Sequence, residues 1–189
     1  MPQVPAEAGK SSFGLIDEER FFAALPLPSV RRALDLGCGA GRYTLALAER
    51  LPAGASVHGV DLWAEGVEKL RRGARERGLE HVTADTGDLA DLGAVPDARI
   101  DLVLLATVLH DLAERGEAAA ALAEASRILR PRGWLAVVEF KKIPTEHGPP
   151  VAIRLSPGDL AALVTPFGFA EPRVVDLGPN AYLALFVRG

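Results

Sequence analysis

Short apolar runs alternate with longer stretches of mixed polarity along most of this chain. The run at 100–106 is almost continuously apolar, which is typical of a strand buried on both faces. The longer stretches place apolar residues at helical spacing among charged ones. This alternation predicts a parallel sheet with helices on both faces. We expect strands at 32–36, 55–61, 81–85, 100–106 and 134–140, and helices at 41–51, 64–77 and 116–129.

The last third of the chain changes this rhythm. Ser156 and Pro157 resemble a helix cap followed by proline at the first helical position, which predicts a helix to about residue 165. Two extended runs follow, at 169–175 and 181–187. The residues between these two runs are too few for a parallel crossover, so the runs must form an antiparallel hairpin.

Two closely spaced prolines separate the N-terminal part of the chain from the rest. A short helix at 17–25 ends at Pro26-Leu27-Pro28, and residues 1–12 are polar with glycine and proline. We therefore divide the chain into an N-terminal extension or lid, 1–29, and one domain, 30–189. The three phenylalanines of the extension either cover a bound ligand or pack on the sheet; they are Phe13, Phe21 and Phe22.

Composition narrows the class of protein. The chain has 189 residues, 49 % of them hydrophobic, a formal net charge of −4 and one cysteine. These values are ordinary for a single globular domain, and the acidic balance disfavours nucleic acid as a partner. One cysteine allows no internal disulfide and fits a reducing, cytoplasmic location. No apolar run reaches the length of a membrane span.

The strand at 32–36 leads into the most informative stretch, Asp35-Leu36-Gly37-Cys38-Gly39-Ala40-Gly41. Alternating glycines allow a sharp turn and bring bare backbone against a ligand. The helix that follows would direct its first N–H groups at a polar or anionic group. Asp35 places a carboxylate at the strand tip, which suits a ligand that carries an ammonium.

This stretch resembles the first motif of class I S-adenosylmethionine-dependent methyltransferases, an acid followed by G-x-G-x-G. The resemblance implies a three-layer, Rossmann-like α/β fold with a seven-stranded sheet, mostly parallel with a C-terminal antiparallel hairpin strand. It also implies that the glycine loop, Cys38 included, wraps the methionine part of the cofactor, S-adenosyl-L-methionine. Asp35 would hold the cofactor's amino group directly or through water. The competing nicotinamide dinucleotide fingerprint requires a small residue where this chain has Arg42.

Asp61 is the second candidate for cofactor binding. It ends the second predicted strand, 20 residues after Gly41, the usual distance for an acid that accepts hydrogen bonds from ribose hydroxyls. The alternative is an ordinary capping acid for the next helix. Leu62 and Trp63 beside it would form an apolar wall for the nucleoside, or Trp63 simply packs.

A third candidate turn, Asp85-Thr86-Gly87-Asp88-Leu89, follows the third predicted strand. The resemblance implies that an acid here accepts the adenine amino group while its neighbours read the ring. Asp88, between Gly87 and Leu89, fits best, and Asp85 is the alternative. Plain turn chemistry would explain the same residues.

The fourth strand ends near the expected reaction centre. By the same resemblance, Ala106 and Thr107 would run beneath the methionine portion of the cofactor. His110 follows, and imidazole, with an ordinary pKa of about 6.5, can take a proton from a nucleophile. His110 either acts as this catalytic base or packs under the cofactor.

The segment from Glu139 to Arg154 leaves the fifth strand where ligands bind in open parallel sheets. It resembles a group of bacterial enzymes near the ubiquinone/menaquinone methyltransferase branch. Glu139 and Lys141 lie on the same side of the strand, and we expect them to pair at the pocket rim. The roles of Glu146 and His147 stay open. Before this strand, Arg132 occupies a turn position that the family fills most often with glycine.

The sequence as a whole predicts a methyltransferase that moves a methyl group to a small-molecule acceptor by in-line displacement. Two alternatives remain: a protein that binds the cofactor without transfer, and a nicotinamide-dependent oxidoreductase. We expect no metal site. The acceptor, its reacting atom and a homodimeric state are left open by the sequence.

Overall fold

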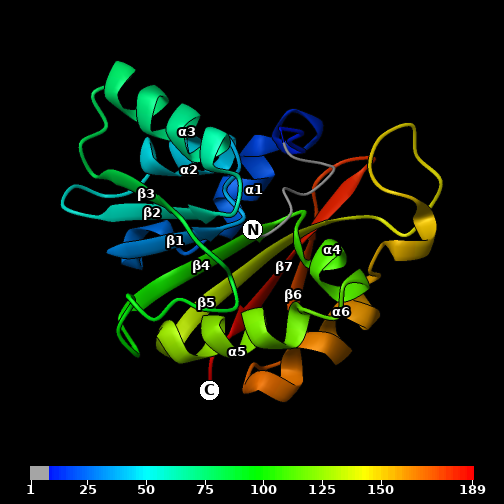
Figure 1. Cartoon of the computed structure of the whole chain (residues 1–189). Coiled ribbons are helices and arrows are strands. Elements are labelled where there is room, and N and C mark those ends of the chain that lie inside the picture. The colour runs from blue at the N-terminus through cyan, green and yellow to red at the C-terminus, as the bar shows by residue number, and fades with distance from the viewer. Residues whose placement is uncertain (1–8) are drawn as a thin grey trace.

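The computed structural model describes residues 9–189, which form a seven-stranded sheet between two layers of helices (Figure 1). The strands are β1 (Arg32–Leu36), β2 (Ser56–Asp61), β3 (Val82–Thr86), β4 (Ile100–Ala106), β5 (Leu129–Phe140), β6 (Arg173–Asp176) and β7 (Ala181–Val187). Their order across the sheet is β3-β2-β1-β4-β5-β7-β6.

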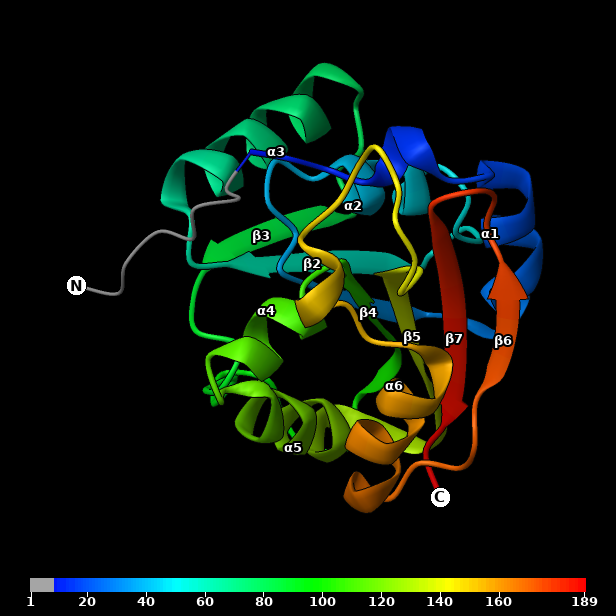
Figure 2. The same ribbon diagram turned by 90° about the vertical axis from the view of Figure 1, so that its right-hand side faces the viewer.

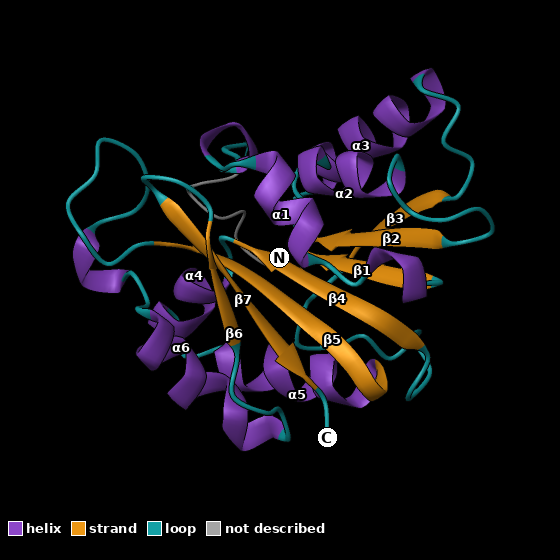
Figure 3. Cartoon of the chain, turned by 180° about the vertical axis from the view of Figure 1, so that it is seen from behind, coloured by secondary structure: helices purple, strands orange, loops and turns teal. Residues whose placement is uncertain are grey.

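The first five strands pair in parallel, and β7 lies antiparallel between β5 and β6 (Figure 3). The predicted C-terminal hairpin is therefore confirmed, as are the five earlier strands. The first four agree to within one residue at their ends, and β5 begins five residues earlier than predicted. Because the parallel strands share one direction, the carboxyl ends of β1, β2, β4 and β5 lie at the same edge of the sheet.

Six α-helices of residues 9–189 cover the sheet. They are α1 (Glu18–Ala24), α2 (Arg42–Ala48), α3 (Ala64–Glu76), α4 (Leu109–Glu114), α5 (Ala118–Ile128) and α6 (Pro157–Val164). Helices α1 to α3 lie on one face and α4 to α6 on the other (Figures 1 and 2). Each face has its own apolar core, one centred on the inner sides of α4, α5 and α6 and the other on α1 and α2.

Local sequence explains where several elements begin. Ser156 and Asp159 form a reciprocal capping box at the start of α6, with Pro157 as its first residue. Gly41, at φ 82°, adopts the left-handed conformation that opens α2. Arg132 also has a positive φ, 62°, which carries some backbone cost. The structure places this predicted turn position inside β5, where the pairing with β4 shifts register between Leu129 and Trp134.

The sequence analysis missed one α-helix of the described residues, α4. This helix has only six residues and no side-chain cap, so neither its periodicity nor its start stood out. In the extension, Phe21 and Phe22 are buried in the core beneath α2, so they pack on the sheet. Residues 1–8 of the predicted N-terminal extension or lid lie outside the described part of the chain. Within residues 9–189, no helix has the length and apolarity needed to cross a bilayer.

Candidate functional site

A cavity of about 620 Å³ opens at the carboxyl ends of the parallel strands. Its volume lies in the usual range for small-molecule sites. Nine of the thirteen predicted site residues line it: Gly37, Gly39, Asp61, Leu62, Asp88, Leu89, Ala106, Thr107 and His110. Trp63, which the sequence left as either a cavity wall or a packing residue, lines it as well. The remaining walls come from the segment 9–15, from the end of α4 and from the loop that follows β5.

The glycine loop is fixed by close packing and by Asp61. Gly37 has φ 79°, and a Cβ atom there would lie 2.5 Å from a methyl group of Val108, so no side chain fits. The Gly39 N–H donates to Oδ2 of Asp61 at 2.7 Å, and the Trp63 N–H donates to Oδ1 at 2.8 Å. A carboxylate offers about four acceptor positions, so Asp61 keeps two for a ligand in the cavity.

Three other predicted residues lie behind the cavity wall. Cys38 is buried against Gly59 in a cluster with Leu70, and burial raises the pKa of its thiol well above the ordinary value. Gly41 packs so closely on Leu70 that a Cβ atom would come within 2.3 Å. The Gly87 N–H donates to the carbonyl oxygen of Asp61 at 3.0 Å. These contacts support the loops of the site, and a direct role toward the cofactor stays a prediction.

Asp35 also lies behind the wall, and its side chain is 1 % exposed. The Thr44 hydroxyl donates to Oδ2 at 2.5 Å, whereas Oδ1 has no hydrogen-bond partner among the described residues. Burial, opposed by the Thr44 hydrogen bond and helped by the charge of Asp61, raises the pKa of Asp35 to about 7. A buried acceptor without a donor invites a cationic or donor group of a ligand.

The pKa of Asp35 predicts how the stability of the ligand-free protein depends on pH. Asp35 binds a proton more tightly in the folded chain, so its contribution is complete below about pH 4 and is lost as pH rises to about 7. The loss is on the order of 4 kcal/mol, or roughly 10 °C in melting temperature for a chain of this size. Thermal melts between about pH 4 and 8 should show this slope, and the variant Asp35→Asn should flatten it. The exposed Asp91→Asn is the control, and an unchanged slope in Asp35→Asn would refute the assignment.

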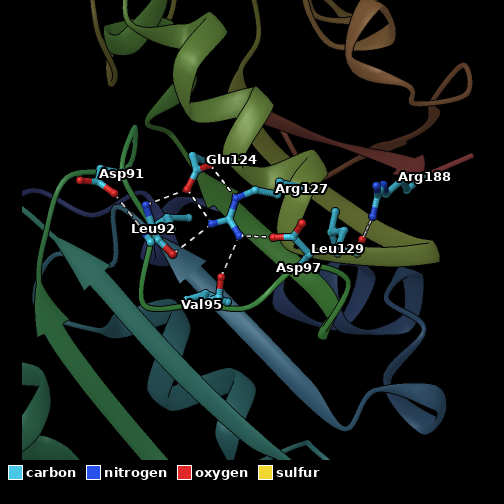
Figure 4. Close-up of polar contacts among 9 residues, drawn as sticks. Asp91, Leu92, Val95, Asp97, Glu124, Arg127, Leu129 and Arg188 are labelled. Atoms are coloured by element: carbon cyan, nitrogen blue, oxygen red, sulfur yellow. Dashed lines mark hydrogen bonds and ion pairs between the residues drawn. The ribbon is translucent and has the colours of Figure 1, made fainter.

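Asp88 and Leu89 belong to the connection between β3 and β4. Figure 4 shows that Arg127 of α5 holds this connection by donating to the carbonyl oxygens of Leu92 and Val95 at 3.1 and 2.9 Å. The same guanidinium pairs with Asp97 and Glu124. Arg127 therefore fixes the loop that carries this side of the cavity.

Asp88, rather than Asp85, faces the cavity. Its Oδ1 accepts from the Ala90 N–H at 2.9 Å, which shapes the turn. Asp85 lies on the far edge of the sheet, where it pairs with Arg71 at 2.9 Å.

Thr107 has φ 56°, a strained conformation for a β-branched residue and one that is concentrated at functional sites. Its backbone N–H donates to the carbonyl oxygen of Val138 at 2.8 Å, and its hydroxyl lies 3.2 Å from the Ser12 hydroxyl. Ser12 is in turn 3.0 Å from the Tyr43 hydroxyl. This chain of hydroxyl groups joins the segment 9–15 to the end of β4 and to α2. No pattern in the sequence indicated Ser12, because its partners are distant along the chain.

His110 lies in the first turn of α4 and forms a buried pair with Glu139 of β5. Its Nδ1 is 2.7 Å from Glu139 Oε2, and its backbone N–H donates to Oε1 at 3.1 Å. Asp111 Oδ1 is 3.4 Å from Nε2. Burial lowers the pKa of His110, but the hydrogen bond and charge of Glu139, with Asp111 and Glu114, outweigh it and raise the pKa above its ordinary value.

The expected pair of Glu139 with Lys141 is wrong. Glu139 is 0 % exposed and both of its oxygens face His110, whereas Lys141 Nζ lies 2.6 Å from Asp176 at the neighbouring hairpin. The strand ends between the two residues, so the alternation that placed them on one side no longer applies at Lys141. Lys142 pairs with Asp159 of α6, while Glu146 and His147 line the cavity mouth.

Comparison with known proteins identifies the class. Residues 33–133 match the family model described as "Methyltransferase domain". The crystal structure of a SAM dependent methyltransferase from Aquifex aeolicus has the same fold, with a TM-score of 0.85 over 94 % of this chain and 93 % of the other, at 24 % identity. This chain belongs to the class I S-adenosylmethionine-dependent methyltransferase family, and its cofactor is S-adenosylmethionine.

Two curated relatives show the range of the family. The chain is 38 % identical to the demethylmenaquinone methyltransferase of Thermus thermophilus, over 60 % of this chain and 49 % of that protein. It is 35 % identical to the S-adenosyl-L-methionine-dependent Diels-Alderase iccD of Talaromyces variabilis, over 67 % of this chain and 42 % of that protein. The matched stretches therefore span less than half of these relatives.

Proposed function

We propose that this chain transfers the methyl group of S-adenosylmethionine to a small-molecule acceptor whose reacting atom carries a proton. The observation that supports this most is the buried pair of His110 and Glu139 in the cavity wall. An acceptor such as a hydroxyl must lose its proton as it is methylated, and an imidazole oriented by a carboxylate is suited to take it.

The residues of the cavity fit the cofactor. Asp61 keeps two acceptor positions for the sugar hydroxyls, and Leu62 and Leu89 give the nucleoside apolar walls. Asp88 is placed to accept from the adenine amino group. Asp35 offers a buried oxygen without a donor, behind the loop that would hold the amino-acid end. Because Asp35 lies behind the wall, we infer that it acts on the ammonium through water or after a small shift of the loop.

When bound, S-adenosylmethionine supplies an already activated methyl group, so the protein mainly provides alignment. Ala106 and Thr107 form the floor under the methionine portion, and the strained backbone of Thr107 holds that floor in one shape. Alignment of this kind contributes up to about 7–11 kcal/mol in favourable systems. His110 receives the acceptor's proton at Nε2, while Glu139 holds Nδ1 and stabilises the imidazolium that forms.

The segment 9–15 acts as a cover in this proposal. It lines the cavity with Gly9, Lys10 and Ser11, and Ser12 joins it to Tyr43 and Thr107. Phe13 packs edge-on against the Tyr43 ring, with 4.9 Å between ring centres. A cover excludes water from the reacting groups and must open to exchange the cofactor.

A transfer assay tests the proposal. The protein, with cofactor labelled in the methyl group, is incubated with neutral phenols, enols and amines, and with fractions of a cell extract. We expect calorimetric binding of S-adenosylmethionine but not of NAD(P), and label in at least one acceptor. Tight binding with no transfer to any acceptor would contradict the proposed reaction and favour a protein that binds the cofactor without transfer.

A further inference from the structure

The loop between β5 and α6 forms the outer wall of the cavity. Figure 2 shows it as the yellow arch that follows β5. Four consecutive residues of this arch line the cavity: Glu146, His147, Gly148 and Pro149. In the proposed function this wall faces the acceptor, since it lines the same cavity as His110. Residues 141–150 of this arch form no helix or strand, so other contacts must give them a defined shape.

Arg154 lies inside this arch with its side chain 3 % exposed. Its guanidinium donates to five oxygens of the arch, all of them uncharged, at 2.7–3.0 Å. The acceptors are the carbonyl oxygens of Lys141, Ile143, His147 and Pro149 and the hydroxyl of Thr145. Every second residue from Lys141 to Pro149 therefore directs an oxygen atom toward the buried guanidinium of Arg154.

The arch also packs on the cavity wall through Phe140. Gly148 has φ 101°, and a Cβ atom there would lie 2.7 Å from the Phe140 ring. The Arg154 guanidinium carbon is 5.6 Å from the centre of the same ring. Phe140 lines the cavity, so the guanidinium is one aromatic ring away from it. The ion pairs of Lys141 and Lys142 hold only the base of the arch.

We propose that Arg154 is a positioning residue that holds residues 145–149 as the acceptor-selecting wall of the site. This inference rests on the proposed function for the acceptor's place in the cavity. Lysine cannot replace arginine here, because a single ammonium has three donors and no planar fork to reach acceptors on several sides. The arch would lose its shape while the glycine loop and Asp61 keep theirs.

The test compares Arg154→Lys and Arg154→Ala with Arg72→Lys, an exposed arginine of α3 that serves as the matched control. We expect the KM for the acceptor to rise about tenfold or more in both Arg154 variants. The dissociation constant for S-adenosylmethionine should stay within about threefold of wild type. Arg127→Lys should instead raise the dissociation constant for S-adenosylmethionine and leave the KM for the acceptor near the wild-type value, because that arginine holds the Asp88 side of the cavity.

Limited trypsin digestion gives a readout that does not depend on turnover. Cleavage after Lys141 and Lys142 should become about tenfold faster in Arg154→Ala, because cleavage follows local opening. Unchanged cleavage, or equal losses of cofactor and acceptor affinity in Arg154→Lys, would overturn the inference. Absence of transfer by the wild type would instead contradict the proposed function, and digestion would then decide alone whether Arg154 holds the arch.

Discussion

Replacing Asp61 with alanine is expected to weaken S-adenosylmethionine binding about 100-fold or more. In the proposed site each sugar hydroxyl donates to an ionised carboxylate, and such hydrogen bonds contribute about 1.5–3 kcal/mol apiece. Two of them correspond to at least two orders of magnitude in affinity, since about 1.4 kcal/mol is tenfold. The same variant leaves the N–H groups of Gly39 and Trp63 without their acceptor, which loosens the glycine loop as well.

Titration calorimetry measures this effect, and two further variants separate its causes. Asp61→Asn keeps one carbonyl oxygen but places an amide NH₂ against one of the two backbone N–H groups, so we expect an intermediate loss. Asp91→Asn, in an exposed turn, should bind like wild type. Thermal melts confirm that each variant is folded. Binding by Asp61→Ala within about threefold of wild type would contradict the placement of the sugar and, with it, the proposed cofactor site.

Sequence patterns located the sheet and one side of the site because both depend on local features. Apolar runs bounded by glycine mark strands, and a glycine loop can be read directly from its residues. Asp61 could be predicted because the spacing between the first turn and the next strand end is set by one strand–helix–strand unit. Gly37 and Gly39, which line the cavity, could be predicted because they belong to the glycine loop.

The acceptor side of the site depends on contacts between distant residues. Glu139 meets His110 only because β5 lies beside β4 and α4 starts immediately after β4, and that short helix left no clear signal. Arg154 looked like one more charged residue after a loop, because no local pattern tells a buried guanidinium from an exposed one. A site that is assembled from several strand ends cannot be predicted from the sequence of any single strand.

Replacing His110 with alanine is expected to lower kcat about 10²–10⁴-fold with an acceptor whose hydroxyl must be deprotonated. The cofactor's dissociation constant should change little, because Asp61 and the glycine loop are untouched. Single-turnover measurements with labelled cofactor separate the transfer step from product release. Full turnover by His110→Ala would show that His110 only packs beneath the ligand.

Replacing Glu139 with glutamine tests the pair without removing the imidazole, because glutamine has the same shape and no charge. A base must be deprotonated to act, so the raised pKa of His110 places the rise of kcat/KM above the ordinary imidazole range. Loss of the Glu139 charge leaves burial to dominate, so the pKa falls and the rise should move to lower pH by about 1–3 units. Asp111→Asn, next to Nε2 at 3.4 Å, should shift the profile in the same direction by less. A profile of Glu139→Gln that keeps its position, or moves to higher pH, would mean that another group accepts the proton.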